Sequence, residues 1–195
     1  TSQSYRAYNV TFTDPNKSES TTSDLTRKGG HMVWFMKQRN IGKQKLSLHQ
    51  ATQKADRFLK TKGFDSLEFV SSDQYDTVGI LTFAKKEKNV LLYPASVKVK
   101  VALDNGEILG FDQTDYLITQ ASNLPNLKPK LTEKEAQAKL RSTMHVEKAA
   151  LVVYKNDQDK NVLCYEFFTT KGKDTYHIFI NAITGQQENV NLLSA

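Results

Sequence analysis

The sequence predicts an α+β fold of tandem units, each with one helix packed on an antiparallel sheet of three or four strands. Two amphipathic stretches begin with the same helix-start pattern, and each is followed by short apolar segments typical of strands. Ser47 lies 59 residues before Gly106, and Thr132 lies 53 residues before Gly185. Recurrence of a helix start and a later glycine at similar spacing indicates an internal repeat.

Both helix starts have the pattern of a capping box. Ser47 and Thr132 are the predicted N-caps, and Gln50 and Glu135 follow three residues later, where their side chains reach back to the cap. The first helix is expected to end at Gly63. Its predicted apolar stripe consists of Leu48, Ala51, Ala55, Phe58 and Leu59. The predicted stripe of the second helix consists of Ala136, Leu140 and Met144.

Several predicted strands follow each helix. Val97, Val99 and Val101 alternate with lysines, which indicates a strand with one buried face. Residues 104–106, Asp-Asn-Gly, predict a type I′ hairpin turn. After the first helix the predicted strands are 67–70, 78–83, 90–93 continuing into 97–103, and 108–111. After the second helix they are 149–154, 161–168, 175–181 and a last strand near 188–192.

The repeat predicts the domain organisation. Residues 1–44, with strands at 5–13 and 32–36, are expected to be the strand half of a partial unit whose helix is missing. Residues 45–121 and 131–195 are the predicted complete units, joined by a proline-containing linker at 122–130. The sequence begins with Thr1 rather than Met, which indicates a fragment or a mature product.

Composition excludes several classes of protein. The 195 residues have a mean hydropathy of −0.54 and 25% charged residues, which is typical of a soluble globular chain. No apolar run approaches the roughly 18 residues of a membrane span. The single cysteine, Cys164, excludes an internal disulfide and is expected to be a buried strand thiol.

The net charge of +6 is concentrated near the start of the sequence. Residues 1–45 contain eight basic and three acidic side chains. A polyanion-binding surface would use Arg27, Lys28, Lys37 and Arg39. The alternative interpretation is a solvated basic face that meets an acidic partner.

Patterns of catalytic residues are missing from the sequence. It contains no nucleophile elbow or phosphate-binding loop, and most aspartates fall at predicted turns. The four histidines are scattered without metal-ligand spacing. We therefore expect neither an enzyme nor a metal or other cofactor. Contact with a partner would use Trp34 and Tyr116, together with Arg27, Lys28 and Arg39.

Two short segments resemble the closing hairpin of the PepSY domain family, whose pattern is Asp-x-x-Thr-Gly-Glu. Residues 181–186 read Asn-Ala-Ile-Thr-Gly-Gln, and residues 102–107 read Ala-Leu-Asp-Asn-Gly-Glu. The family's aspartate is replaced by Asn181 and Ala102, and its glutamate is retained only as Glu107. Through residues 29–36, 185–193 and the intervening repeats, the chain also resembles the C-terminal region of the YpeB family of spore-germination proteins.

The second resemblance implies a non-enzymatic partner of a cortex-lytic cell-wall hydrolase of the SleB type, which it would restrain or stabilise. It also implies a location in the spore, at the outer side of the inner membrane or in the cortex region, through an anchor absent from this chain. No nucleic-acid partner is expected. The alternative from the residues themselves is a module that binds peptidoglycan or another polyanion, and an enzyme ranks third.

Overall fold

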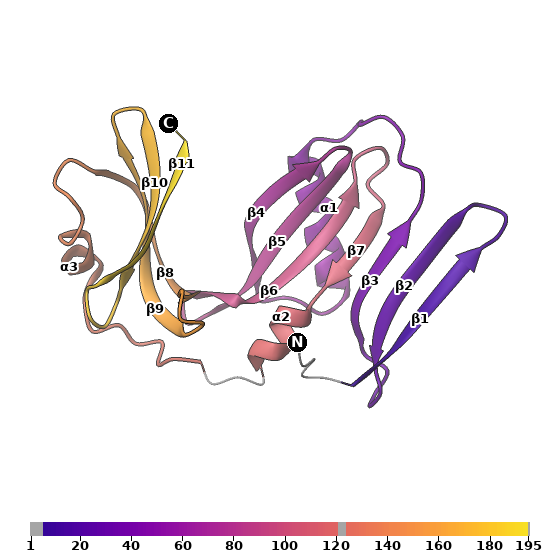
Figure 1. The fold of residues 1–195 in the computed structure, drawn as a ribbon, viewed down its shortest axis with the longest axis horizontal. Helices are drawn as coiled ribbons and strands as arrows, with labels where there is room; N and C mark the ends of the chain where they lie inside the picture. Colours follow the sequence, from indigo (N-terminus) through magenta and orange to yellow (C-terminus); the bar gives the residue numbers. More distant parts are fainter. Residues whose placement is uncertain (1–5, 121–123, 195) are drawn as a thin grey trace. The chain divides into compact units, whose positions relative to one another are not determined.

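The computed structural model describes residues 6–120 and 124–194. The chain forms two compact units, Thr1–Lys85 with Ala95–Ala121, and Lys86–Pro94 with Ser122–Ala195 (Figure 1). We call them unit 1 and unit 2. Tyr5 of a predicted strand and the first two residues of the predicted linker lie outside the described residues. The division at 1–44, 45–121 and 131–195 stays a prediction about the repeat.

Unit 1 is a sheet with one long helix on it. In sheet order its strands are β1 (Ala7–Asp14), β2 (Glu19–Thr26), β3 (Met32–Gln38), β7 (Ile108–Asp112), β6 (Val90–Ala102), β5 (Val78–Glu87) and β4 (Leu67–Tyr75). Of β5 and β6, unit 1 holds the parts up to Lys85 and from Ala95. The pairs β1–β2, β2–β3, β3–β7, β7–β6 and β5–β4 are antiparallel. Because β3 pairs with β7, the first three strands join the same sheet as the later ones.

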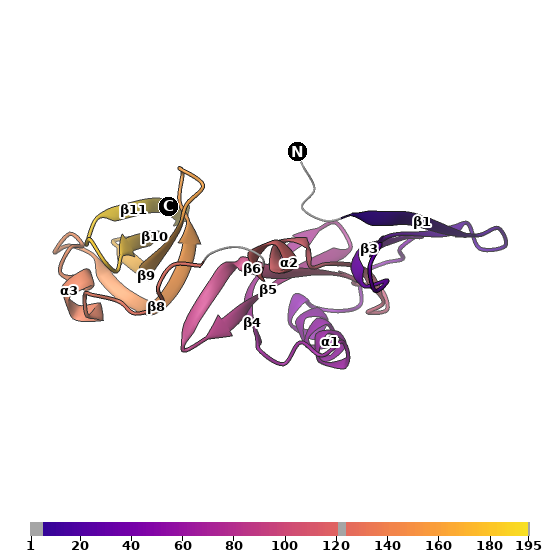
Figure 2. The same cartoon turned by 90° about the horizontal axis from the view of Figure 1, so that it is seen from below.

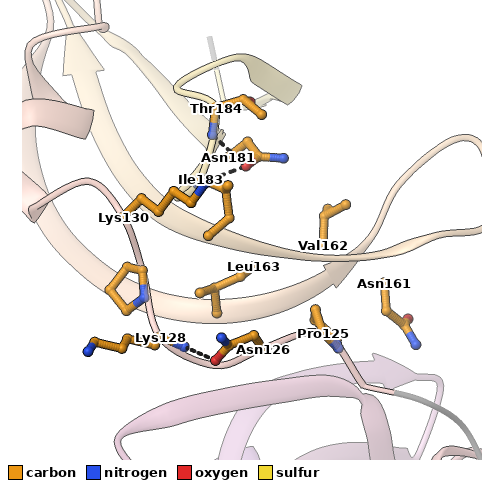
Figure 3. Close-up of a pocket in the computed structure, with 11 residues that line it drawn as sticks. Pro125, Asn126, Lys128, Lys130, Asn161, Val162, Leu163, Asn181, Ile183 and Thr184 are labelled. Atoms are coloured by element: carbon orange, nitrogen blue, oxygen red, sulfur yellow. Dashed lines mark hydrogen bonds between the residues drawn. The ribbon is translucent and has the colours of Figure 1, made fainter.

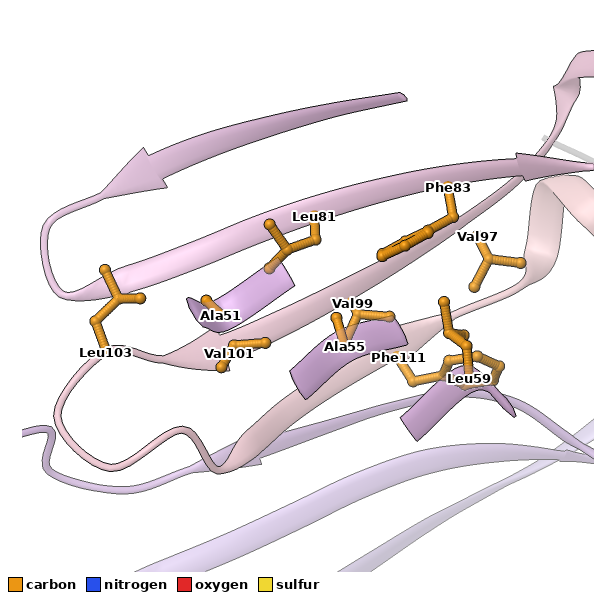
Figure 4. Packing of buried hydrophobic residues seen from close by; sticks show 10 residues of the cluster. All are labelled: Ala51, Ala55, Leu59, Leu81, Phe83, Val97, Val99, Val101, Leu103 and Phe111. Carbon is orange, nitrogen blue, oxygen red and sulfur yellow. The ribbon is translucent and has the colours of Figure 1, made fainter. Parts of the chain in front are cut away.

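Helix α1 (Leu48–Thr61) covers one face of this sheet (Figure 2). Ala51, Ala55 and Leu59 recur at helical spacing and are fully or almost fully buried, as their positions in the sequence predict. Alternate residues of β6, Val97, Val99 and Val101, meet them from the strand side (Figure 4). The periods of helix and strand therefore produce one shared core. The remaining buried members are Leu81, Phe83, Leu103 and Phe111.

Unit 2 has a shorter helix. Leu91 and Leu92 of β6 pair in parallel with β8 (His145–Lys155). The sheet then continues with antiparallel pairs through β9 (Asn161–Lys171) and β10 (Asp174–Asn181) to β11 (Gln187–Ser194). Helix α3 (Glu133–Gln137) has the predicted capping box but only five residues. Beyond it, the Lys139 and Leu140 N–H groups donate three residues back rather than four, so the helix stops. Leu140 and Met144 therefore lie outside it, contrary to the sequence prediction.

Two turns also differ from the prediction. Loop 103–106 has a positive φ only at Gly106, whereas a type I′ turn needs it at both central residues. The Gly106 N–H instead donates to the Ala102 carbonyl across a four-residue loop. The type I′ requirement is met between β5 and β6, where Lys88 and Asn89 have φ values of 50° and 64°. Strand β2 and helix α2 (Thr114–Gln120) were not expected from the sequence.

Within residues 6–120 and 124–194, the structure has no helix long and apolar enough to cross a membrane. The α+β class is confirmed, with strands in the majority. The sheet of unit 1 is larger than the predicted three or four strands.

The capping box of α1 gives a stability prediction. The Ser47 hydroxyl accepts from the Gln50 N–H at 3.2 Å, and the Gln50 side chain accepts from the Ser47 N–H at 3.0 Å. Replacing Ser47 by Ala should lower the free energy of unfolding by about 1 kcal/mol. Urea unfolding of the variant measures this loss. The exposed turn variant Ser142→Ala is the control, and equal midpoints for the two variants would contradict the prediction.

Candidate functional site

The same backbone corner occurs once in each unit. In unit 1 the Leu103 carbonyl accepts from the N–H groups of Lys45 and Leu46, at the entry to α1. In unit 2 the Ala182 carbonyl accepts from those of Lys130 and Leu131, at the entry to α3. Both loops close on a glycine of positive φ, +80° at position 106 and +75° at position 185. Each corner joins the chain entering a helix to the turn that closes the sheet.

In unit 1 this corner is filled by a partly buried ion cluster. The guanidinium of Arg39 donates to both carboxylate oxygens of Asp104, at 2.8 and 2.9 Å, and to Glu107 at 2.6 Å. Only 8% of the Arg39 side chain is exposed. Glu107 also binds Lys37 at 2.7 Å, and Lys37 binds Glu19 at 2.9 Å. We call these five side chains the corner clamp.

Two acids of the clamp, Asp104 and Glu107, are stabilised in their charged form. Hydrogen bonds from Arg39 hold the pKa of Asp104 well below its usual range, and hydrogen bonds from Lys37 and Arg39 lower the pKa of Glu107. The same bonds raise the pKa values of the two basic side chains. Lys37, Arg39, Asp104 and Glu107 therefore stay ionised at neutral pH.

In unit 2 the clamp is missing and the corner is open. Arg39 lies seven residues before Leu46, and the residue seven before Leu131 is Leu124. Asp104 lies two residues before Gly106, and the residue two before Gly185 is Ile183. A pocket of about 630 Å³ opens at this corner (Figure 3). It is lined by Pro125, Asn126, Lys128, Pro129, Lys130, Asn161, Val162, Leu163, Asn181, Ile183 and Thr184.

The chemistry of this corner pocket suits binding. Among the described residues, its lining combines apolar side chains, three amides and two lysines, without an acid, histidine or cysteine. The Asn181 oxygen accepts from the N–H groups of Ile183 and Thr184, which fixes the turn, and its nitrogen donates to Glu188. The Asn161 side-chain oxygen is inaccessible to solvent and has no hydrogen-bond partner. Amides and ammonium groups on an apolar wall fit an extended, amide-bearing ligand.

A second buried polar group in unit 2 was not foreseen from the sequence. Glu166 is 3% exposed, and one of its carboxylate oxygens contacts both the Tyr93 hydroxyl, at 2.6 Å, and His177 Nε2. The His177 ring stacks on Phe168 with centroids 4.3 Å apart. Burial, with the Glu166 charge, raises the pKa of Tyr93, so its hydroxyl stays a donor. The three residues come from three strands, and only alternation within each strand could have suggested that they share a face.

The predicted partner-binding residues differ in their exposure and in their contacts. Arg27 and Lys28 are exposed at the β2–β3 turn, and the Arg27 guanidinium lies 5.3 Å from the Tyr8 ring centre. Trp34 is half-buried in β3. Tyr116 is half-buried on α2, against Phe64. Arg39, with Lys37, belongs to the corner clamp and is occupied within the fold.

Cys164 is fully buried, as predicted, and burial raises the pKa of its thiol to about 12. A thiol of this kind is a poor nucleophile. In the part of the chain that the structure describes, no group of three or more His, Cys, Asp or Glu side chains could hold a metal ion.

The corner clamp gives a pH-dependent prediction. Replacing Arg39 by Met leaves two partly buried acids short of donors and should lower the free energy of unfolding at pH 7 by roughly 2–3 kcal/mol. Because the carboxyl pKa values are depressed, the clamp contributes fully above about pH 4–5 and is lost as pH falls through the folded values. Urea unfolding from pH 7 to 3 should show a steeper fall for the native sequence than for the variant. Parallel curves would contradict the prediction.

Comparison with known proteins gives consistent results. Residues 1–125 match the family model described as YpeB sporulation, PepSY1 and PepSY2 domains, and residues 130–191 match the peptidase propeptide and YPEB domain. The chain is 38% identical to the sporulation protein YpeB of Halalkalibacterium halodurans over 94% of its own length and 41% of the relative's. It is also 38% identical to that of Bacillus subtilis, over 95% of its own length and 42% of the relative's.

A solved structure is similar along almost the whole chain. The Bacillus megaterium YpeB C-terminal domain aligns with a TM-score of 0.87 and 41% identity, covering 98% of this chain and 85% of that one. The chain spans about two fifths of the length of the two curated relatives. These matches cover both corners and both capping boxes, and they confirm the resemblance predicted from the sequence. The chain belongs to the YpeB family of sporulation proteins and contains PepSY domains.

Proposed function

We propose that the chain is a non-catalytic binding module of spore germination that binds a cortex-lytic cell-wall hydrolase of the SleB type and restrains or stabilises it. Membership of the YpeB family supports a role in sporulation. The proposed location is the spore, at the outer side of the inner membrane or in the cortex region.

The corner pocket of unit 2 is the observation that carries the proposal. It has the size of a ligand site, about 630 Å³, and its lining holds amides, ammonium groups and apolar side chains. An extended loop of a hydrolase could place a carboxylate near Lys128 or Lys130. A short apolar side chain of the same loop would lie on Leu163 and Ile183.

The tandem-repeat interpretation of the fold supports the same proposal. Both corners have the same backbone hydrogen bonds, both helices have capping boxes, and only unit 1 has the clamp. We infer that the predicted complete units, 45–121 and 131–195, are copies of one PepSY unit, in which one corner is closed by its own side chains and the other is left for a partner. Duplication of this kind frees one copy from the need to stabilise itself.

Filling the pocket tests this function. The Ile183→Trp variant should reduce binding to the purified hydrolase by about tenfold or more, because the indole occupies the space of the bound loop. Digestion of cortex peptidoglycan by the hydrolase, with increasing amounts of this chain, measures restraint. Activity of the hydrolase after heating, with and without the chain, measures stabilisation.

Val190→Trp is the matched control, because Val190 is an aliphatic residue of the same unit, 44% exposed and outside the pocket. It should bind the hydrolase like the native chain. If both variants bound the hydrolase equally well, the pocket would be excluded as the binding site. No effect of the native chain on either digestion or heat inactivation, even at large excess, would refute the proposed function.

Binding of peptidoglycan or another polyanion is the second candidate. Arg6, Arg27 and Lys28 line a recess of about 490 Å³ in unit 1, and the corner clamp leaves these three out. The double variant Arg27→Gln/Lys28→Gln should pellet with purified sacculi several times less than the native chain at low salt. The difference should disappear as salt screens the charges. Salt-independent pelleting, or equal pelleting by the double variant, would contradict this function.

A further inference from the structure

Strand β1 forms the outer edge of the unit 1 sheet and lacks the features that usually protect an edge (Figure 1). Among the described residues it pairs only with β2. All eight of its residues are in unbroken register, from Ala7 opposite Thr26 to Asp14 opposite Glu19, without a bulge. Its sequence, AYNVTFTD, contains no proline or lysine. Long regular edges without such residues are templates for another strand.

The free edge of β1 is defined by the alternation of its hydrogen bonds. The Arg27 N–H donates to the Arg6 carbonyl at 2.9 Å, so even-numbered residues of β1 bond to β2. The odd-numbered residues therefore direct their N–H and C=O groups away from β2. These residues are Ala7, Asn9, Thr11 and Thr13.

One face of this edge is apolar. Tyr8 is 56% exposed and Phe12 is 65% exposed, and Val10 lies between them on the same face. Arg6 and Asp14 continue this face at the two ends, with opposite charges. The order along the face is therefore positive, aromatic, aliphatic, aromatic, negative.

This order is self-complementary in an antiparallel pair. A second copy whose two-fold axis passes at Val10 places Tyr8 opposite Phe12 and Arg6 opposite Asp14, each twice. The odd-numbered residues then form the hydrogen-bonded pairs, as their outward groups require. The even-numbered residues form the close, non-hydrogen-bonded pairs, in which aromatic and opposite-charge side chains interact most strongly. Moving the register by one pair in either direction separates the opposite charges.

The charged side chains near β1, Lys17 and Arg27, do not block the contacts of the proposed strand pair. Lys17 lies 3.8 Å from Asp14, but this pair is exposed, with 67% and 40% of the two side chains accessible. Exposed pairs contribute little to stability, so Lys17 competes only weakly. Arg27 lies over the Tyr8 ring and does not occupy the backbone edge.

We propose that β1 is a self-association edge, through which two copies of this chain form an antiparallel, two-fold symmetric strand pair centred on Val10. The interface is one strand wide and therefore reversible and concentration-dependent. It is separate from the corner pocket, which lies in the other unit.

Thr11→Pro tests the backbone part of the proposal. The Thr11 N–H faces away from β2, so proline there removes no hydrogen bond within the sheet but blocks strand addition. Sedimentation velocity over a concentration series should show a reversible dimer for the native chain and at least about tenfold weaker association for this variant. Thr11→Ala is the matched control, since it also loses the contact with the Thr22 hydroxyl, and it should dimerise like the native chain.

A charge swap tests the register. Arg6→Asp and Asp14→Arg should each weaken the dimer about tenfold, because each places like charges opposite one another at both ends. The double variant Arg6→Asp/Asp14→Arg restores both opposite pairs and should dimerise like the native chain. The charge variants test the proposal even if the Thr11→Pro variant fails to fold.

A native chain that remains monomeric at every concentration would overturn the proposal, as would a Thr11→Pro variant that folds and dimerises normally. A double charge variant no better than the single ones would refute the register centred on Val10.

Discussion

The fold depends on a single carbonyl oxygen in each unit that accepts two backbone N–H groups. The Leu103 and Ala182 carbonyls each hold the chain at the point where it enters a helix. Without these bonds, two adjacent N–H groups at the start of each helix would have to find other partners, which costs about 1–3 kcal/mol for each buried group. The constraint fixes where each helix starts relative to the sheet beneath it, and the capping boxes follow directly after it.

The two units satisfy this constraint with different side chains. In unit 1 a bidentate arginine and two carboxylates surround the corner, and α1 is 14 residues long and covers a full core. In unit 2 Leu124 and Ile183 stand in place of Arg39 and Asp104, Gln186 stands in place of Glu107, α3 has five residues, and a pocket lies at the corner. Because a charge in a partly buried ion cluster is costly without its partner, loss of the arginine would favour loss of the acid as well. Leu124 and Ile183 agree with a coupled exchange of this kind.

Sequence patterns predicted the parts of the fold that depend on local periodicity. Both capping boxes, the α1 stripe and the strands around Val97–Val101 were found because apolar spacing and cap chemistry act within a few residues. The length of α3 was not predicted correctly, because only the hydrogen bonds after it show where the helix ends and tighter turns begin. The two positive-φ residues at Lys88 and Asn89 were missed because neither is glycine.

The candidate site was harder to predict because its residues are distant in sequence. Arg39 was counted as a surface cation, whereas Asp104 and Glu107, more than 60 residues away, enclose it. The sequence did contain a signal for the clamp. Asp104 and Glu107 lie in the closing turn of one repeat, whereas the closing turn of the other repeat has Ile183 and Gln186 at these positions. Charge alone points to the basic start of the sequence as a binding surface. Once Lys37 and Arg39 are assigned to the clamp, only Arg27 and Lys28 remain of the four cations predicted for that surface, and the open corner of unit 2 becomes the stronger candidate for contact with a protein partner.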